Sequence, residues 1–163
     1  MTKADWELAA YVAAVVQGIA VPLSLALVLL QLRKQSRLTQ AANTQALVEI
    51  SSPFNLALIQ DEKVAELWVK GAADYDGMNE VRKYQFTSLI IWWMLLHENI
   101  YYQWRHKLID PATYLSWEGD LRAFLPMANV RKHWPEYRRV CQADFVRHVD
   151  DLIEKSGSPM SPE

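Results

Sequence analysis

The chain has 163 residues, of which 51% are hydrophobic, and a formal net charge of −2 at pH 7. This apolar content excludes an intrinsically disordered chain, while a mean hydropathy of −0.10 excludes a transporter with several membrane spans. The near-neutral charge gives no reason to expect nucleic acid as a partner, and the single cysteine, Cys141, permits no intrachain disulfide.

The first predicted element is a transmembrane helix at residues 8–31. Residues 8–30 read LAAYVAAVVQGIAVPLSLALVLL, without charge and with Gln17 and Ser24 as the clearly polar residues. At about 1.5 Å per residue, this stretch crosses a hydrocarbon core of ~30 Å. A cleaved signal peptide would need a basic segment before a shorter apolar stretch, whereas two acids and one lysine precede this one. A buried helix of a soluble protein is the remaining alternative.

Basic residues follow the predicted span closely. Arg33, Lys34 and Arg37 precede the first acid after the span, Glu49. Basic residues resist transfer across a membrane and accumulate on its cytoplasmic side. We therefore expect a single-pass protein of a bacterial inner membrane, with residues 1–7 outside and the bulk of the chain in the cytoplasm. The three basic side chains are expected to lie near the headgroups of membrane lipids.

Small residues recur at every fourth position of the predicted span and form one narrow stripe. Gln17 lies near its middle, and the stripe itself is Ala10, Ala14, Gly18, Pro22 and Ala26. Such a stripe lets another membrane helix approach closely, and a glutamine adds a hydrogen bond that lipid does not supply. The alternative is that the spacing arose by chance, because alanine is common in such helices. Pro22 also predicts a kink, since it leaves a carbonyl one turn earlier without a donor.

Residues 32–155 are predicted to form a cytoplasmic helical bundle of about five helices. Apolar positions three and four apart continue well past the span, which indicates one face of a helix. The pair Ser52-Pro53 either restarts this helix or kinks it. Asp61 is expected to cap a short helix that ends at Gly71, with a loop after it.

The longest predicted helix of the bundle covers residues 80–107, with Asn79 as its cap. Its centre, SLIIWWMLL, is apolar on all sides. The apolar run stops at His97-Glu98 and is too short for a second membrane span. We therefore expect the central helix of the bundle, surrounded by neighbours.

Two further helices are predicted after this central one. Asp110-Pro111 supplies the cap and first-turn proline of the next helix, which ends at Pro126. A stretch punctuated by Pro135 leads to a last amphipathic helix. The tail, residues 156–163, is expected to be disordered. The predicted fold class is therefore all-α.

Few residues of the bundle indicate chemistry. A helical zinc motif needs two histidines four positions apart, and the histidine after His97 is His106, so we predict no metal, cofactor or catalytic residue. Glu98 follows an apolar run, where a carboxylate must be paired, hydrogen-bonded or protonated. One interpretation is structural, with Glu98 pinning a neighbouring helix through Asn43 or Gln45. The other makes Glu98 an acid, a base or an ion site.

Three segments of the chain resemble a bacterial family. They are the apolar amino-terminal stretch, TQALVEISSPFNLALIQDEKVAELWVKG at 44–71 and HENIYYQWRHKLID at 97–110. The most specific part is a polar group on the last segment with two downstream aromatic residues: Glu98, Asn99, Tyr102, Gln103, Trp117 and Phe145. Over most of its length the chain is similar to an uncharacterised family of small single-span membrane proteins with a cytoplasmic helical domain. The resemblance implies a membrane-bound helical protein without an assigned enzyme activity. Within the polar group, Glu98, Asn99 and Tyr102 are the candidates for buried polar side chains.

These features favour a non-enzymatic interaction or scaffold module anchored in a membrane. It would bind a membrane protein, as an accessory subunit of a larger inner-membrane assembly, or bind itself as a homo-oligomer. The surplus of tryptophan agrees with either, because tryptophan is enriched at interface hot spots. One alternative is an oligomeric pore built around the small-residue stripe and Gln17. The other is an enzyme in which Glu98 acts as general acid or base, which requires His97, Tyr101 and Tyr102 to converge with it on a cavity.

Overall fold

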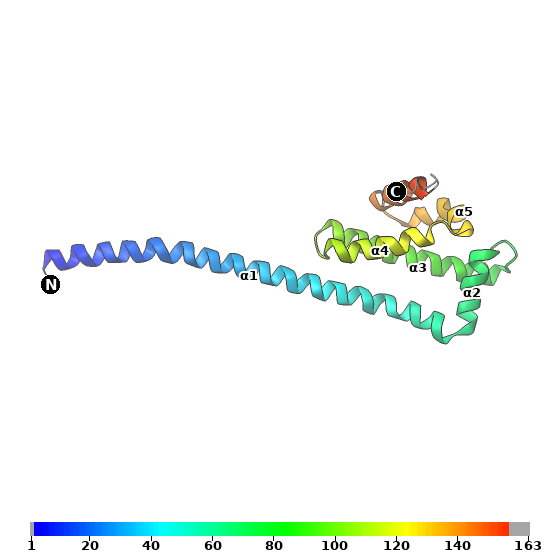
Figure 1. Cartoon of the computed structure of the whole chain (residues 1–163), viewed down its shortest axis with the longest axis horizontal. Coiled ribbons are helices and arrows are strands. Elements are labelled where there is room, and N and C mark those ends of the chain that lie inside the picture. The colour runs from blue at the N-terminus through cyan, green and yellow to red at the C-terminus, as the bar shows by residue number, and fades with distance from the viewer. Residues whose placement is uncertain (1, 157–163) are drawn as a thin grey trace, which may run out of the picture. The chain divides into compact units, whose positions relative to one another are not determined.

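The computed structural model describes residues 2–156, and the regular secondary structure in this range is helical (Figure 1). Its elements are α1 (Lys3–Gln60), α2 (Glu62–Ala73), α3 (Glu80–Arg105), α4 (Pro111–Phe124), α5 (Ala128–Tyr137), the short 3₁₀ helix η1 (Arg138–Val140) and α6 (Ala143–Ser156). The predicted all-α class, with a long apolar first helix and five α-helices after it, is confirmed. Of the tail predicted to be disordered, residues 156–163, Ser156 is the last residue of α6, and residues 157–163 fall outside the described residues.

The chain divides into two compact units, with the boundary between Thr39 and Gln40. In unit 1, the amino-terminal one, every residue from 10 to 39 is exposed. Among the described helices, α1 is the one that is long and apolar enough to cross a membrane, by length and composition. Its most apolar stretch has a mean hydropathy of 2.3, and none of that stretch is buried. A membrane anchor and a signal sequence both satisfy these two criteria.

Local side-chain caps begin three helices of unit 2 at the predicted positions. Asp61, Asn79 and Asp110 each accept a hydrogen bond from a backbone N–H in the first turn of the helix that follows, at 2.9–3.0 Å. Each cap satisfies an N–H group that has no partner within the helix. The starts of α2, α3 and α4 are therefore encoded within three or four residues of sequence.

Gly71 lies inside α2 rather than ending it, because α2 continues to Ala73. A Cβ atom at Gly71 would lie 2.2 Å from the ring of Phe86. Phe86 belongs to α3 and is buried. The glycine is therefore required by the close approach of the two helices, and the sequence-based prediction of a helix end here was wrong.

Three prolines lie in helix interiors, beyond the first turn. Pro22 and Pro53 lie inside α1, so α1 does not restart at residue 53, and Pro135 lies inside α5. A proline inside a helix leaves the carbonyl four positions earlier without its usual donor. For Pro53 and Pro135 those carbonyls belong to Glu49 and Arg131, which are both exposed. Water can reach them there, so the helix tolerates the loss of the hydrogen bond.

The core of unit 2 is built around α3, as expected for the central helix of the bundle. α3 packs against α2, α4 and α5. Along α3 the buried residues occupy nearly all faces of the helix in its second half, which explains why SLIIWWMLL is apolar on all sides. The buried residues of α3 are Phe86, Ile90, Trp93, Met94, Leu96, His97, Glu98, Ile100 and Tyr101.

The carboxyl end of α3 is closed by side chains from the unit 2 part of α1. Lys107 follows α3 in a left-handed backbone conformation, with φ of 59°. The carbonyls of Lys107 and Leu108 accept hydrogen bonds from the amides of Gln40 and Asn43, each at 3.1 Å. These bonds satisfy carbonyls in the turn that ends the helix. Asn43 therefore binds this turn. It is not the hydrogen-bond partner of Glu98 that we predicted.

Candidate functional site

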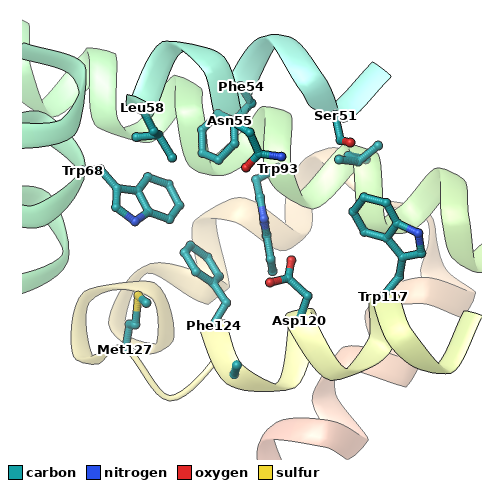
Figure 2. Close-up of a pocket in the computed structure, with 12 residues that line it drawn as sticks. Ser51, Phe54, Asn55, Leu58, Trp68, Trp93, Trp117, Asp120, Phe124 and Met127 are labelled. Carbon is teal, nitrogen blue, oxygen red and sulfur yellow. The ribbon is translucent and has the colours of Figure 1, made fainter. Parts of the chain in front are cut away.

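A cavity of about 280 Å³ lies among four helices of unit 2 (Figure 2). We call it the aromatic pocket. Its lining comes from the second half of α1, from α2, α3 and α4, and from the turn after α4. The lining residues are Ser51, Phe54, Asn55, Leu58, Trp68, Trp93, Leu96, Trp117, Asp120, Ala123, Phe124 and Met127.

Helical spacing and close packing bring aromatic rings together around this pocket. Asp120 and Phe124 are one turn apart on α4 and so share a face. The ring centroids of Trp93 and Phe124 are 4.0 Å apart, and those of Trp68 and Phe124 are 5.1 Å apart. Phe54 lies 5.2 Å from Trp68. Such separations are typical of packed aromatic pairs, so the pocket has a continuous aromatic wall drawn from all four helices.

Asp120 is the single charged residue in the lining. Figure 2 shows its carboxylate directed into the pocket, and its side chain is 58% exposed. On its other side Asp120 lies near His97, whose Nε2 is 3.4 Å from Asp120 Oδ2. The His97 ring is buried, and its Nδ1 lies 3.0 Å from the carbonyl of Trp93. Because a carbonyl only accepts, Nδ1 carries the proton of that bond.

The Nε2 atom of His97 is buried and makes no hydrogen bond with the described residues. The 3.4 Å separation from Asp120 is within ion-pair range, but it does not satisfy hydrogen-bond geometry. Asp120 therefore has a nearby imidazole but no lysine or arginine close enough to form an ion pair with it in the described chain. The pocket offers apolar surface, the negative faces of aromatic rings and a carboxylate that solvent can reach.

Glu98, the leading polar candidate, holds the start of α6. It is buried, and its Oε1 accepts a hydrogen bond of 2.5 Å from the backbone N–H of Gln142. Gln142 precedes α6, and its carbonyl accepts the first bond of that helix, from Val146. A carboxylate near a helix amino terminus is stabilised by the unpaired N–H groups and by the helix dipole. Glu98 thus joins α3 to another helix, but its partner is α6 rather than the predicted Asn43 or Gln45.

Tyr102 acts at the same helix start, one turn after Glu98. Its hydroxyl lies near the backbone of Phe145, while burial and the negative charges of Asp144 and Glu98 raise its pKa. Asn99 differs from our expectation, because it is exposed and its amide oxygen accepts from Gln103 at 2.8 Å. The reason is geometric, since each step along a helix turns about 100°. Glu98 and Tyr102 share the buried face, and Asn99 does not.

The residues that an acid–base site at Glu98 would need are turned to different neighbours. His97 faces Asp120 of α4. Tyr101 stacks on His148 of α6, with ring centroids 4.9 Å apart. Glu98 accepts the backbone N–H of Gln142 at the start of α6, and Tyr102 lies near the backbone of Phe145. These four side chains therefore do not converge on one cavity.

The predicted residues of unit 1 are all exposed. These residues are the stripe of Ala10, Ala14, Gly18, Pro22 and Ala26, together with Gln17, Arg33, Lys34 and Arg37. A Cβ atom added at Gly18 would meet nothing within 4 Å. Within the residues that the structure describes, the stripe is therefore uncovered along its whole length.

A polar cluster that we did not predict joins α4 to α6. The hydroxyl of Tyr114 donates to Glu118 at 3.0 Å and lies 3.0 Å from Nε2 of His148, which is 3.2 Å from the same carboxylate. Burial raises the pKa of Tyr114 and lowers the pKa of His148. Both shifts favour the neutral form of the group. The spacing of Tyr114 and Glu118 is visible in the sequence, but His148 lies 34 positions from Tyr114.

Along residues 2–156 no three or more His, Cys, Asp or Glu side chains are grouped so that they could hold a metal ion. No family model, no curated protein and no solved structure matches the chain.

Asp120 and its aromatic surroundings are the site residues that sequence reasoning missed. The helical spacing of Trp117 and Phe124 can be seen in the sequence, but the sequence does not show which helices face these two residues.

Proposed function

We propose that the protein is a membrane-anchored, non-enzymatic helical binding module. Its amino-terminal helix would span a bacterial inner membrane once, and unit 2 would lie in the cytoplasm. One observation carries the proposal: large apolar side chains are exposed along residues 8–32 of unit 1. These side chains are Leu8, Tyr11, Val12, Val15, Val16, Ile19, Val21, Leu23, Leu25, Leu27, Val28, Leu29, Leu30 and Leu32.

Transfer of this surface out of water is strongly favourable. Burial of one valine, leucine or isoleucine side chain is worth roughly 1.5–3 kcal/mol, and nothing in the described chain covers these residues. A lipid bilayer covers such a helix on all sides, and the helix satisfies its own backbone hydrogen bonds. The basic residues Arg33, Lys34 and Arg37 support an inward-facing carboxyl end, because basic residues resist translocation.

Binding is proposed at two surfaces. In the membrane, the open stripe around Gly18 suits close packing against a helix of another membrane protein or of a second copy of this chain. In unit 2, the aromatic pocket offers a concave, largely apolar surface with one carboxylate, which is typical of a binding site. A binding role needs no group that moves a proton, and it is consistent with Glu98 being engaged by α6.

Membrane anchoring and orientation are tested by cysteine labelling in intact cells. Ala4→Cys and Gln85→Cys are each made in a Cys141→Ser background, because both positions are exposed. A membrane-impermeant maleimide should label residue 4 in intact cells, whereas residue 85 should react after the inner membrane is opened. Alkaline carbonate should leave both variants in the membrane pellet. Release into the supernatant, or the reverse labelling pattern, would contradict the proposal.

Helix association is tested by oxidative crosslinking in native membranes. Ala14→Cys lies on the stripe, and Val12→Cys, about 200° away around the helix, is its matched control. Self-association through the stripe should give a disulfide-linked dimer with Ala14→Cys and little with Val12→Cys. A membrane-protein partner should instead give a product of higher mass when a photoreactive residue is placed at position 14, but not when it is placed at position 12. If neither product forms, the stripe is not an interface.

A further inference from the structure

The lining of the aromatic pocket has an unusual chemical composition. Five of its residues carry aromatic rings, one is a carboxylate and none is basic; the aromatic residues are Phe54, Trp68, Trp93, Trp117 and Phe124. The faces of aromatic rings carry negative electrostatic potential and attract cations within about 6 Å. The carboxylate of Asp120 adds a full negative charge at the same pocket. The other polar side chains of the lining, Ser51 and Asn55, carry no charge. The ring faces and the one charged group of the lining therefore favour a positive ligand.

We propose that the aromatic pocket binds a small alkylammonium ion, with the charged nitrogen near Asp120 and the alkyl groups against the tryptophan and phenylalanine rings. The inference deepens the binding role proposed above and rests on it. A volume of about 280 Å³ accommodates such an ion with space for a short substituent. Ring faces recognise quaternary ammonium groups because the alkyl surface is apolar while the charge is spread over it.

Other ligand classes fit this lining less well. An anion would lie next to the Asp120 carboxylate with no lysine or arginine in the lining to neutralise it. A metal ion needs several hard or soft ligands, and Asp120 is the one carboxylate there. A phospholipid headgroup carries a phosphate beside its ammonium, and that phosphate would likewise find no basic side chain. The free ion, without an anionic substituent, therefore matches the pocket best.

His97 supports this assignment through its geometry. Its Nδ1 is engaged by the Trp93 carbonyl, and its Nε2 approaches Asp120 from the protein interior at 3.4 Å. The ring does not line the pocket. It limits the positions that the carboxylate can take, because a side chain at 3.4 Å blocks movement inward. The exposed side of Asp120 stays directed towards the pocket, where a cation can approach it (Figure 2).

The test uses the full-length protein in dodecyl maltoside, a detergent without charge or ammonium. Choline chloride is titrated and followed by calorimetry and by tryptophan fluorescence, with 3,3-dimethylbutan-1-ol as the neutral molecule of the same shape. Choline should bind saturably and at least about tenfold more tightly than the neutral alcohol, because charge recognition of this kind changes affinity by about that factor. Glycerophosphocholine should bind more weakly than choline. Equal affinity for choline and the alcohol would overturn the proposal, as would tighter binding of glycerophosphocholine.

Variants localise the binding to the pocket. Asp120→Asn should weaken choline binding about tenfold or more, while Glu154→Gln, an exposed carboxylate on α6, should leave it unchanged. Trp117→Leu keeps an apolar side chain but removes the ring, and it should weaken choline more than the alcohol. Circular dichroism identifies any variant that fails to fold, and the remaining variant then decides. Wild-type affinity in both folded pocket variants would refute the site. Binding in detergent does not depend on membrane insertion, so a failed labelling experiment and a failed titration are separate results.

Discussion

Glu98 offers the most direct test of how the bundle is held together. Its carboxylate receives the N–H of Gln142 at the start of α6, at 2.5 Å. A hydrogen bond to a charged group contributes about 1.5–3 kcal/mol, and a negative charge at a helix amino terminus adds about 0.3–1 kcal/mol. Burial of the carboxylate opposes both contributions, because the charge loses hydration. The net effect is expected to be stabilising.

Two substitutions separate these contributions. Glu98→Gln keeps an acceptor of the same shape but removes the charge, so it should lower the free energy of unfolding by about 1 kcal/mol. Glu98→Ala also removes the acceptor and leaves the N–H of Gln142 unpaired, so it should cost about 3 kcal/mol. The order of stability should therefore be wild type, then Glu98→Gln, then Glu98→Ala.

Urea unfolding of the detergent-solubilised chain, followed by tryptophan fluorescence, measures these differences. Six of the seven tryptophans lie in unit 2, so the signal reports mainly on the bundle. Glu154→Gln, on the exposed surface of α6, is the control and should stay within about 0.5 kcal/mol of wild type. If Glu98→Gln is as stable as wild type or more stable, the cost of burying the charge exceeds its contribution to the cap. The stabilising role of Glu98 would then be refuted.

Three other predictions concern packing, pH and reactivity. Gly71→Ala should destabilise the bundle by about 1–2 kcal/mol in the same urea assay, because its Cβ would meet the Phe86 ring. Gly119→Ala, with open space around it, should instead stabilise the bundle by about 0.5–1 kcal/mol. Equal effects of the two substitutions would contradict the close approach of α2 and α3 at Gly71. Burial lowers the pKa of His148 from 6.5, so the unfolded chain binds more protons there, and stability should fall as pH drops below about 6.5. His148→Gln should reduce this fall between pH 7.5 and 5.5, and an unchanged slope would exclude that role. Burial and the negative charge of Glu98 raise the pKa of Cys141 to about 11. Alkylation of Cys141 by iodoacetamide at pH 8 should therefore be about 100-fold slower than that of an exposed thiol. Comparable rates would show that the thiol is accessible to solvent.

Features that depend on a few neighbouring residues could be predicted from the sequence. The caps at Asp61, Asn79 and Asp110 each act within three positions, so type and spacing are sufficient. The central position of α3 followed from an apolar run too long for one face. Gly71 misled the prediction, because a glycine that ends a helix and a glycine that admits a neighbouring ring look the same in one sequence.

Features that depend on which helices meet could not be predicted in this way. The burial of Glu98 followed from the apolar run before it, but its partner is 44 positions away. Asp120 is exposed, and no pattern in the sequence distinguishes it from other surface carboxylates. Its importance arises from aromatic rings on three other helices. Those contacts are set by tertiary packing, for which neither periodicity nor local spacing carries a signal.

The link between Glu98 and the start of α6 also has a consequence for biosynthesis. α3 leaves the ribosome 44 residues before the backbone group that pairs with it. At synthesis rates of about 5–20 residues per second, roughly 2–9 s pass between the two events. Throughout that interval Glu98 and Tyr101 of α3 lack the partners that they meet at α6. A chain cut short before residue 142 never forms these contacts, which makes completion of α6 a late step in closing the bundle.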